Sequence, residues 1–204
     1  MSINPKKTGI MGGTFDPVHL GHLGVASAAL EEGGLEEVIF MPAYIQPFKQ
    51  DRYVADPDDR LNMLKLSCMY QDRFKVSTWE IEQETVSYTY DTVMHILSEE
   101  KIESISFIMG SDSFLQIEKW YKGKDLLKVC SFIVGLRETN DRKAVKEYAL
   151  RLNGEYGSEI TLLEKNMLPI SSSMIREMVI NNKPITGLVS PLVEEYIYSH
   201  ELYI

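Results

Sequence analysis

The sequence is poor in cysteine and in positive charge, and each shortage argues against a class of protein. Its two cysteines, Cys68 and Cys130, lie far apart in apolar segments, without the paired spacing of a metal or redox site. We therefore expect two reduced, buried thiols. Lys and Arg number 21 against 30 Asp and Glu, which gives a formal net charge of -9. A broad basic surface for nucleic acid is not expected, because such binding requires many phosphates to be neutralised.

Long apolar runs are also missing. No run approaches the roughly 20 residues that cross a bilayer, and the polar residues 1–7 lead directly into the first expected strand, which leaves no room for a signal peptide. We therefore expect a cytoplasmic protein that does not contact a membrane. What is present is ordinary globular composition, with 44% hydrophobic and 25% charged residues among 204. Without repeats or linker composition, the sequence predicts a single domain over residues 1–204.

Short apolar segments alternate with amphipathic ones along most of the chain. We expect strands at residues 8–11, 37–41, 74–81, 104–109, 131–136 and 159–164, and helices at 20–32, 58–70, 90–99 and 142–152. This alternation predicts an α/β fold of the Rossmann-like, doubly wound type, with a mainly parallel sheet covered on both faces. Residues 171–181 and 191–198 have helical patterns with no strand after them. The sequence therefore predicts a small C-terminal helical appendage over about 171–204.

A glycine-rich turn follows the first expected strand. Residues 12–22 have the sequence GGTFDPVHLGH, and glycines allow backbone N–H groups to approach an anion at the start of the next helix. His19 and His22 are three residues apart, so their side chains share one face of the first helical turn. The turn is not a Walker A loop and lacks the G-x-G-x-x-G pattern, and no acidic residue ends the second strand to hold a ribose. These features predict a phosphate site of another kind.

Two separated motifs carry a resemblance to a known family. The string GGTFDPVHLGH, followed late in the chain by ISSSMIR at residues 170–176, resembles the nucleotidyltransferases with HxGH and ISSTxIR signatures. The similarity is greatest to the bacterial nicotinate-nucleotide adenylyltransferase family. It extends over nearly the whole chain and includes Pro47, Lys49, Arg60, Met63-Leu64, Ser87-Tyr88-Thr89, Asp91-Thr92, Gly110-Ser111-Asp112, Trp120 and residues 191–203.

The resemblance implies adenylyl transfer from ATP to nicotinate mononucleotide, which gives nicotinate adenine dinucleotide and pyrophosphate in NAD biosynthesis. Such a reaction depends on positioning and on charge stabilisation around the α-phosphate more than on covalent chemistry. The implied catalytic residues are His19, His22, Lys49 and Arg176. The implied ATP-binding residues are Gly12, Gly13, Thr14, Phe15, Gly21, Gly110, Asp112, Ser171, Ser172 and Ser173.

Four further residues are implied to bind the pyridine nucleotide: Tyr88, Thr89, Trp120 and Tyr121. An indole can stack on a pyridine ring, and hydroxyl and N–H donors can hold its carboxylate. No set of residues has metal-ligand spacing, so Mg²⁺ is expected to arrive with ATP. The chain departs from the family pattern at Phe48, where relatives have histidine, and at residues 137–139, where they often have Arg-Pro-Gly.

Several alternatives remain open from the sequence. One of the three serines at 171–173 can be explained by helix capping alone. Asp112 or Ser111 can cap a helix after the strand. Trp120 can be an ordinary half-buried packing residue. The acceptor can be nicotinamide mononucleotide or phosphopantetheine, and the chain can be a regulatory module that binds nucleotide without catalysis. ATP and nicotinate mononucleotide are the expected partners, and a homo-oligomer is possible.

Overall fold

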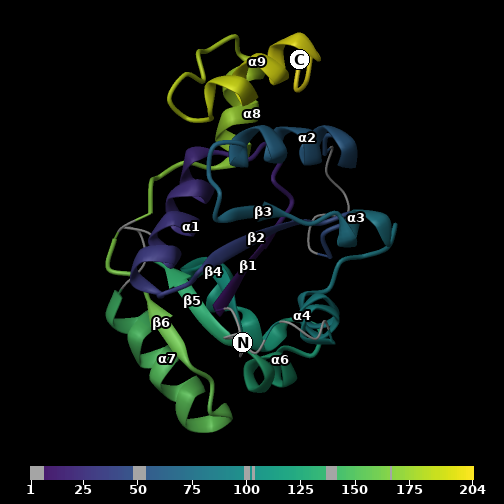
Figure 1. Ribbon diagram of the computed structural model, residues 1–204. Helices are drawn as coiled ribbons and strands as arrows, with labels where there is room; N and C mark the ends of the chain where they lie inside the picture. Colours follow the sequence, from purple (N-terminus) through teal and green to yellow (C-terminus); the bar gives the residue numbers. More distant parts are fainter. Residues whose placement is uncertain (1–6, 48–53, 99–101, 103, 137–141, 166) are drawn as a thin grey trace.

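The chain forms one parallel β-sheet with helices on both of its faces. The computed structural model describes residues 7–47, 54–98, 102, 104–136, 142–165 and 167–204 (Figure 1). Within this part of the chain the sheet has six strands in the order β3-β2-β1-β4-β5-β6, and every adjacent pair is parallel. The Rossmann-like, doubly wound fold expected from the sequence is therefore confirmed.

The strands are β1 (Lys7–Gly13), β2 (Glu37–Pro42), β3 (Phe74–Val76), β4 (Ser104–Gly110), β5 (Ser131–Gly135) and β6 (Ile160–Leu162). The helices are α1 (Leu20–Glu32), α2 (Pro57–Cys68), α3 (Trp79–Glu82), α4 (Thr89–Ser98), α5 (Ser111–Phe114), the 3-10 turn η1 (Ile117–Lys119), α6 (Gly123–Val129), α7 (Arg142–Tyr156), α8 (Ser172–Ile180) and α9 (Pro191–Ser199).

Local sequence signals account for the ends of the helices near β1. Helix α1 ends where the Gly33 N–H donates to the Ala29 carbonyl at 3.0 Å. Helix α2 begins with Pro57 and carries Asp58 and Asp59 in its first turn, which suits the positive end of a helix dipole. The end of α1 and the start of α2 therefore follow from local sequence signals.

Two apolar cores lie on opposite faces of the sheet. Helices α1, α2, α8 and α9 contribute to the first core, and α4, α6 and α7 to the second. Strand β4 serves both, because Ile108 packs into the first core while Phe107 and Met109 pack into the second. This alternation follows from the two-residue period of a strand.

The strand order reverses at β1. The chain builds β2 and β3 on one side of β1 and then crosses to build β4, β5 and β6 on the other. Loops leave the carboxyl ends of β1 and β4 in opposite directions, which opens a crevice where doubly wound folds bind ligands. In Figure 1, helices α8 and α9 lie at the opposite end of the molecule from α4 and α6.

Three expectations about local structure need correction. The strand predicted over 74–81 ends at Val76, the last residue of β3 paired with β2, because the chain then leaves the sheet edge and forms helix α3. The segment from Ser111 to Val129 contains α5, η1 and α6, of which only a helix start at Ser111 or Asp112 was considered from the sequence. Helix α7 continues to Tyr156, four residues beyond the predicted end at 152.

The cysteines and the lengths of the described helices relate to two further expectations, on buried thiols and on membrane-spanning segments. Both cysteines are free thiols; Cys68 is buried and Cys130 is half-buried, so the second is less enclosed than expected. Burial raises the pKa of each thiol to about 12, which keeps both protonated at neutral pH. Among the described residues no helix combines the length and apolarity needed to span a membrane.

Candidate active site

A cavity of about 360 Å³ opens at the carboxyl ends of β1 and β4. Its walls come from the turn after β1, the first turn of α1, the end of β4 and the first turn of α8. Every predicted site residue within the described part of the chain lines it: Gly12, Gly13, Thr14, Phe15, His19, Gly21, His22, Tyr88, Thr89, Gly110, Asp112, Trp120, Tyr121, Ser171, Ser172, Ser173 and Arg176. Lys49 and Phe48 lie outside the described residues.

The two histidines form a reciprocal cap at the start of α1. His19 is the N-cap residue, and its Nδ1 accepts the His22 N–H at 3.4 Å. The Nδ1 atom of His22 accepts the His19 N–H at 3.2 Å. Their rings stack with centroids 3.6 Å apart, and the buried ring of Phe15 packs edge-on against His22 at 5.1 Å. The sequence spacing therefore places both imidazoles side by side, as predicted.

This cap assigns the histidine tautomers. A ring nitrogen that accepts an N–H must present its lone pair, so Nδ1 is unprotonated in both rings. The proton of each neutral imidazole then resides on Nε2. Both histidines line the cavity, and this tautomer carries its N–H donor on Nε2, the form that can hydrogen-bond to a phosphate oxygen.

Gly21 is required for this arrangement. A Cβ atom at Gly21 would lie 2.9 Å from the Nδ1 atom of His19, closer than side chains tolerate. The sequence suggested that a small residue makes room for a nucleotide over the helix start. The structure adds a nearer reason, since the glycine makes room for the His19 ring itself.

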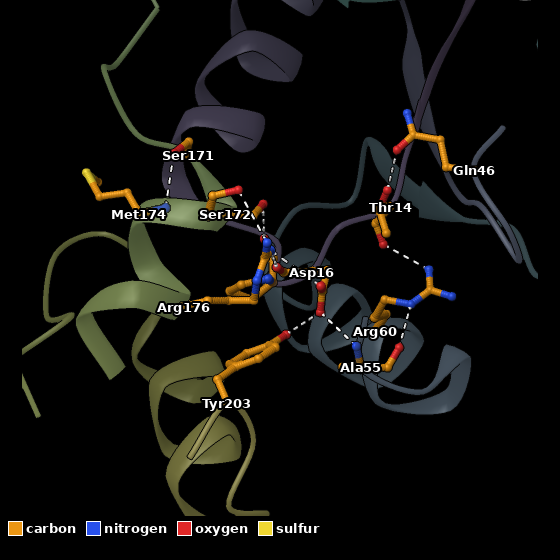
Figure 2. Close-up of polar contacts among 12 residues, drawn as sticks. Thr14, Asp16, Gln46, Ala55, Arg60, Ser171, Ser172, Met174, Arg176 and Tyr203 are labelled. Atoms are coloured by element: carbon orange, nitrogen blue, oxygen red, sulfur yellow. Dashed lines mark hydrogen bonds and ion pairs between the residues drawn. The ribbon is translucent and has the colours of Figure 1, made fainter. Parts of the chain in front are cut away.

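The first turn of α8 lines the same cavity as the two histidines, and Figure 2 shows its polar contacts. Ser171 is its N-cap, and its Oγ accepts the Met174 N–H at 3.2 Å. Ser172 Oγ donates to the Pro17 carbonyl at 2.9 Å, and Ser173 Oγ accepts from Arg176 Nη2 at 3.3 Å. Ser171 thus caps the helix, Ser172 joins it to the turn after β1, and Ser173 holds the Arg176 side chain of the same helix.

Arg176 and Asp16 connect the two motifs. Arg176 Nη1 donates to the Asp16 carbonyl at 2.6 Å and lies 3.4 Å from the Asp16 Oδ2 atom. The Oδ1 atom of Asp16 accepts the Ala55 N–H at 3.1 Å and the Tyr203 hydroxyl at 2.7 Å (Figure 2). Asp16 is therefore the point where the β1 turn, the loop before α2, helix α8 and the end of the chain meet.

Arg60 supports the same turn from below the cavity. Its side chain is only 1% exposed, and its guanidinium donates to the carbonyls of Ala43, Ala55, Thr14 and Tyr44 at 2.6 to 3.2 Å. Burial lowers the pKa of Arg60, and the negative charge of Asp16 opposes that effect. The guanidinium cross-links the turn after β1 to both ends of the connection between β2 and α2.

Aromatic side chains form another part of the cavity wall. Trp120 is half-buried and packs edge-on against Phe107 with ring centroids 6.1 Å apart. The rings of Tyr88 and Tyr121 lie 4.5 Å apart, and Thr89 begins α4 beside them. This wall offers ring faces and hydroxyl groups to a flat, polar ligand.

Glu80 is a buried carboxyl group on the wall of the cavity. It accepts hydrogen bonds from the hydroxyls of Thr92 and Ser87, while burial raises its pKa. Ser87 Oγ in turn accepts the Tyr44 N–H at 3.1 Å. Glu80 thereby ties the segment before α4 to the loop that follows β2.

The end of β4 differs from one expectation. Gly110 is the N-cap residue of the short helix α5, with no side-chain cap, so neither Ser111 nor Asp112 caps it. Ser111 is buried, because it follows the strand directly into the core, and its Oγ has no hydrogen-bond partner among the described residues. Asp112 lies in the first turn of α5 and lines the cavity.

Sequence reasoning missed several residues that shape the site. Asp16 and Tyr203 were not singled out, nor were Glu80 and Gln46, whose Oε1 accepts from Thr14 Oγ at 2.7 Å. Asp16 lies inside the GGTFDP string, so its position beside a phosphate turn was an available signal. The others carry no local signal, because their partners are distant in sequence.

Comparisons with known proteins agree with this geometry. The profile of the cytidylyltransferase-like family matches residues 10–178. A protein of Moorella thermoacetica named "probable nicotinate-nucleotide adenylyltransferase" is 42% identical over 200 residues, which cover 98% of this chain and 92% of the relative. A protein of Caldicellulosiruptor bescii with the same name is 39% identical over 197 residues, which cover 97% and 98% of the two chains.

A solved structure has the same fold. The nicotinic acid mononucleotide adenylyltransferase of Plasmodium falciparum, solved with NaAD, superposes with a TM-score of 0.77 at 20% identity and 97% coverage of both chains. The fold is thereby independently supported, and the relatives match almost the full length of the sequence. The chain belongs to the nicotinate-nucleotide adenylyltransferase family.

Proposed function

We propose that this protein transfers the adenylyl group of ATP to nicotinate mononucleotide and releases pyrophosphate. One observation carries the proposal: a single cavity brings the histidine pair at the start of α1 together with the first turn of α8 and an aromatic wall. The first two features suit a triphosphate, and the third suits a pyridine ring. The family relatives support the same reaction.

In this proposal the ATP phosphates lie between the two helix starts. His19 and His22 donate from Nε2 to the α-phosphate, where negative charge develops in the transition state. Arg176 and the N–H groups at the start of α8 hold the β- and γ-phosphates, together with Ser171, Ser172 and Ser173. Lys49 supplies a further positive charge. The remaining ATP contacts are assigned to Gly12, Gly13, Thr14, Phe15, Gly21, Gly110 and Asp112.

Nicotinate mononucleotide lies against the aromatic wall. Its ring stacks on Trp120, and Tyr88, Thr89 and Tyr121 provide polar contacts near its carboxylate. An oxygen of its phosphate attacks the α-phosphorus of ATP and forms a new P–O bond. The bond from the α-phosphorus to the bridging oxygen breaks, and pyrophosphate leaves with that oxygen.

Magnesium enters as part of the ATP substrate. The described residues contain no cluster of three or more His, Cys, Asp or Glu side chains that could hold a metal ion. Asp16, on the cavity wall, already pairs with Arg176 and Tyr203. This donor set fits a cation held by phosphate oxygens and water, which would neutralise charge on the leaving pyrophosphate.

Residues 1–204 act as one nucleotidyltransferase domain in this proposal. The helical part, 171–204, contributes the wall formed by the first turn of α8 and fixes it to the β1 turn through Arg176 and Tyr203. A regulatory module without catalysis is disfavoured because both histidines and Arg176 lie in the same cavity.

The acceptor preference tests the proposal. Pyrophosphate release is measured with ATP and Mg²⁺ and, in turn, nicotinate mononucleotide, nicotinamide mononucleotide and phosphopantetheine. We expect the highest kcat/KM with nicotinate mononucleotide. Turnover with none of the three acceptors would exclude the proposed adenylyltransferase activity. Preference for nicotinamide mononucleotide would exclude nicotinate mononucleotide as the assigned substrate.

Replacing Trp120 by alanine should raise the KM for nicotinate mononucleotide by about tenfold, because the pyridine ring loses its stacking partner. The KM for ATP should change by less than about twofold. Trp120→Phe keeps a ring and should recover most of the affinity. Equal effects of Trp120→Ala on both substrates would show that the indole supports the fold instead of the acceptor.

A further inference from the structure

The last turn of the chain contacts a residue of the cavity wall. Tyr203 lies 187 residues from Asp16, and its hydroxyl donates to the Asp16 Oδ1 atom at 2.7 Å (Figure 2). Both residues are buried, with exposed fractions of 6% for Tyr203 and 3% for Asp16. A charged group that is buried so fully needs several donors to offset its lost hydration.

Each oxygen of the Asp16 carboxylate has a different partner. The Oδ1 atom accepts from Tyr203 and from the Ala55 N–H, whereas the Oδ2 atom faces Arg176 Nη1 at 3.4 Å. The tyrosine and the amide therefore fix the rotation of the carboxylate. Because the carboxylate is fixed, its second oxygen has a defined direction toward the arginine.

Tyr203 is suited to be a permanent donor. Burial raises its pKa, and the neighbouring Asp16 carboxylate raises it further, so the phenol stays protonated throughout the neutral range. The positive charges of Arg176 and Arg60 act in the opposite direction but do not reverse the shift. The hydrogen bond from the end of the chain is thus present at any pH at which the protein would work.

Arg176 is held on two sides. Its Nη1 donates to the Asp16 carbonyl at 2.6 Å, and its Nη2 donates to Ser173 Oγ at 3.3 Å. These two bonds use two of the five N–H donors of a guanidinium. Its side chain is 21% exposed and lines the cavity, so its orientation determines which donors a ligand meets.

We propose that Tyr203 is a positioning residue for ATP: it fixes the Asp16 carboxylate, which holds the Arg176 guanidinium in the direction that receives the triphosphate. This inference rests on the proposed function, in which Arg176 contacts the β- and γ-phosphates. According to this inference, the end of the chain increases the affinity of the site for ATP. Tyr203 itself contacts neither substrate and is not a catalytic residue.

Tyr203→Phe removes one hydroxyl and keeps the buried ring. We expect the KM for ATP to rise by about tenfold, the usual effect of losing a hydrogen bond to a charged group. The KM for nicotinate mononucleotide should change by less than about twofold. The matched control is Tyr198→Phe, because Tyr198 is 44% exposed on α9, and it should leave both constants unchanged.

The same substitution in a protein that lacks the Arg176 side chain distinguishes a positioning role of Tyr203 from a role in folding. In Arg176→Ala protein, Tyr203→Phe should change the KM for ATP by less than about twofold, because the group through which it acts is gone. Asp16→Asn in otherwise unchanged protein provides a second route to the same effect, and it should also raise the KM for ATP selectively. All assays are run well below the melting temperature of each variant.

The possible results distinguish the inference from the proposed function. An unchanged KM for ATP in both Tyr203→Phe and Asp16→Asn, equal increases for both substrates, or a full tenfold effect without Arg176 would each overturn the inference and leave the reaction standing. Absence of adenylyl transfer by the unaltered protein would overturn the proposed function and the inference with it.

Discussion

Replacing His22 by alanine is expected to lower kcat for adenylyl transfer by about 10² to 10³-fold, the usual cost of removing one charge-stabilising donor. The ring lines the cavity at the start of α1, and its Nδ1 atom accepts the His19 N–H at 3.2 Å. Its donor to the α-phosphate is therefore Nε2. Steady-state kinetics at saturating ATP and nicotinate mononucleotide measure the effect.

Two further variants separate catalysis by His22 from helix capping. In His22→Asn, the side-chain oxygen can take over the role of Nδ1 as acceptor, but nothing replaces Nε2. We expect it to lose activity as His22→Ala does, with a melting temperature close to that of the unaltered protein. His22→Gln places an amide nitrogen near the Nε2 position and should recover part of kcat. A loss below about threefold in His22→Asn would mean that His22 serves only the helix.

Replacing Arg60 by methionine should lower the free energy of unfolding by about 3 to 5 kcal/mol, as expected when one member of a buried charged network is removed. Methionine fills similar space but donates no hydrogen bonds. The carbonyls of Ala43, Ala55, Thr14 and Tyr44 would lose their donor, and Asp16 would lose a nearby positive charge. Unfolding in urea, followed by circular dichroism, gives the measurement.

Two controls accompany the Arg60 variant. Arg73 is exposed, so Arg73→Met should change stability by less than about 0.5 kcal/mol. Arg60→Lys keeps the charge but cannot reach four carbonyls with one ammonium group. Its free energy of unfolding should lie between those of Arg60→Met and Arg73→Met. A loss below about 1 kcal/mol in Arg60→Met would contradict the cross-linking role of the guanidinium.

Local sequence patterns predicted helices and strands of the fold, and they also predicted that site residues distant in sequence lie together. The apolar stripe of 20–32, bounded by the HxGH string and Gly33-Gly34, gives helix α1 with the predicted bounds. In a parallel sheet, residues that follow β1 and β4 must meet at one edge. His19 and Gly110 therefore line one cavity, and Ser171, at the start of α8, lines it as well.

The contacts that stabilise the site could not be predicted in the same way. Asp16 pairs with Tyr203 and Arg60 donates to four separate carbonyls, and such pairings depend on how distant loops pack. The strand predicted over 74–81 failed for a related reason. Its apolar residues satisfy a strand pattern, but after Val76 the chain turns into α3, where Glu80 is buried beside Thr92.

The most direct test follows the oxygen atoms of the transferred group. Nicotinate mononucleotide carrying ¹⁸O in the non-bridging positions of its phosphate is incubated with the protein, ATP and Mg²⁺, and the products are analysed by mass spectrometry. Attack on the α-phosphorus predicts nicotinate adenine dinucleotide that retains all of the label and pyrophosphate that carries none. Label in pyrophosphate, or no dinucleotide at all, would contradict adenylyl transfer in this cavity.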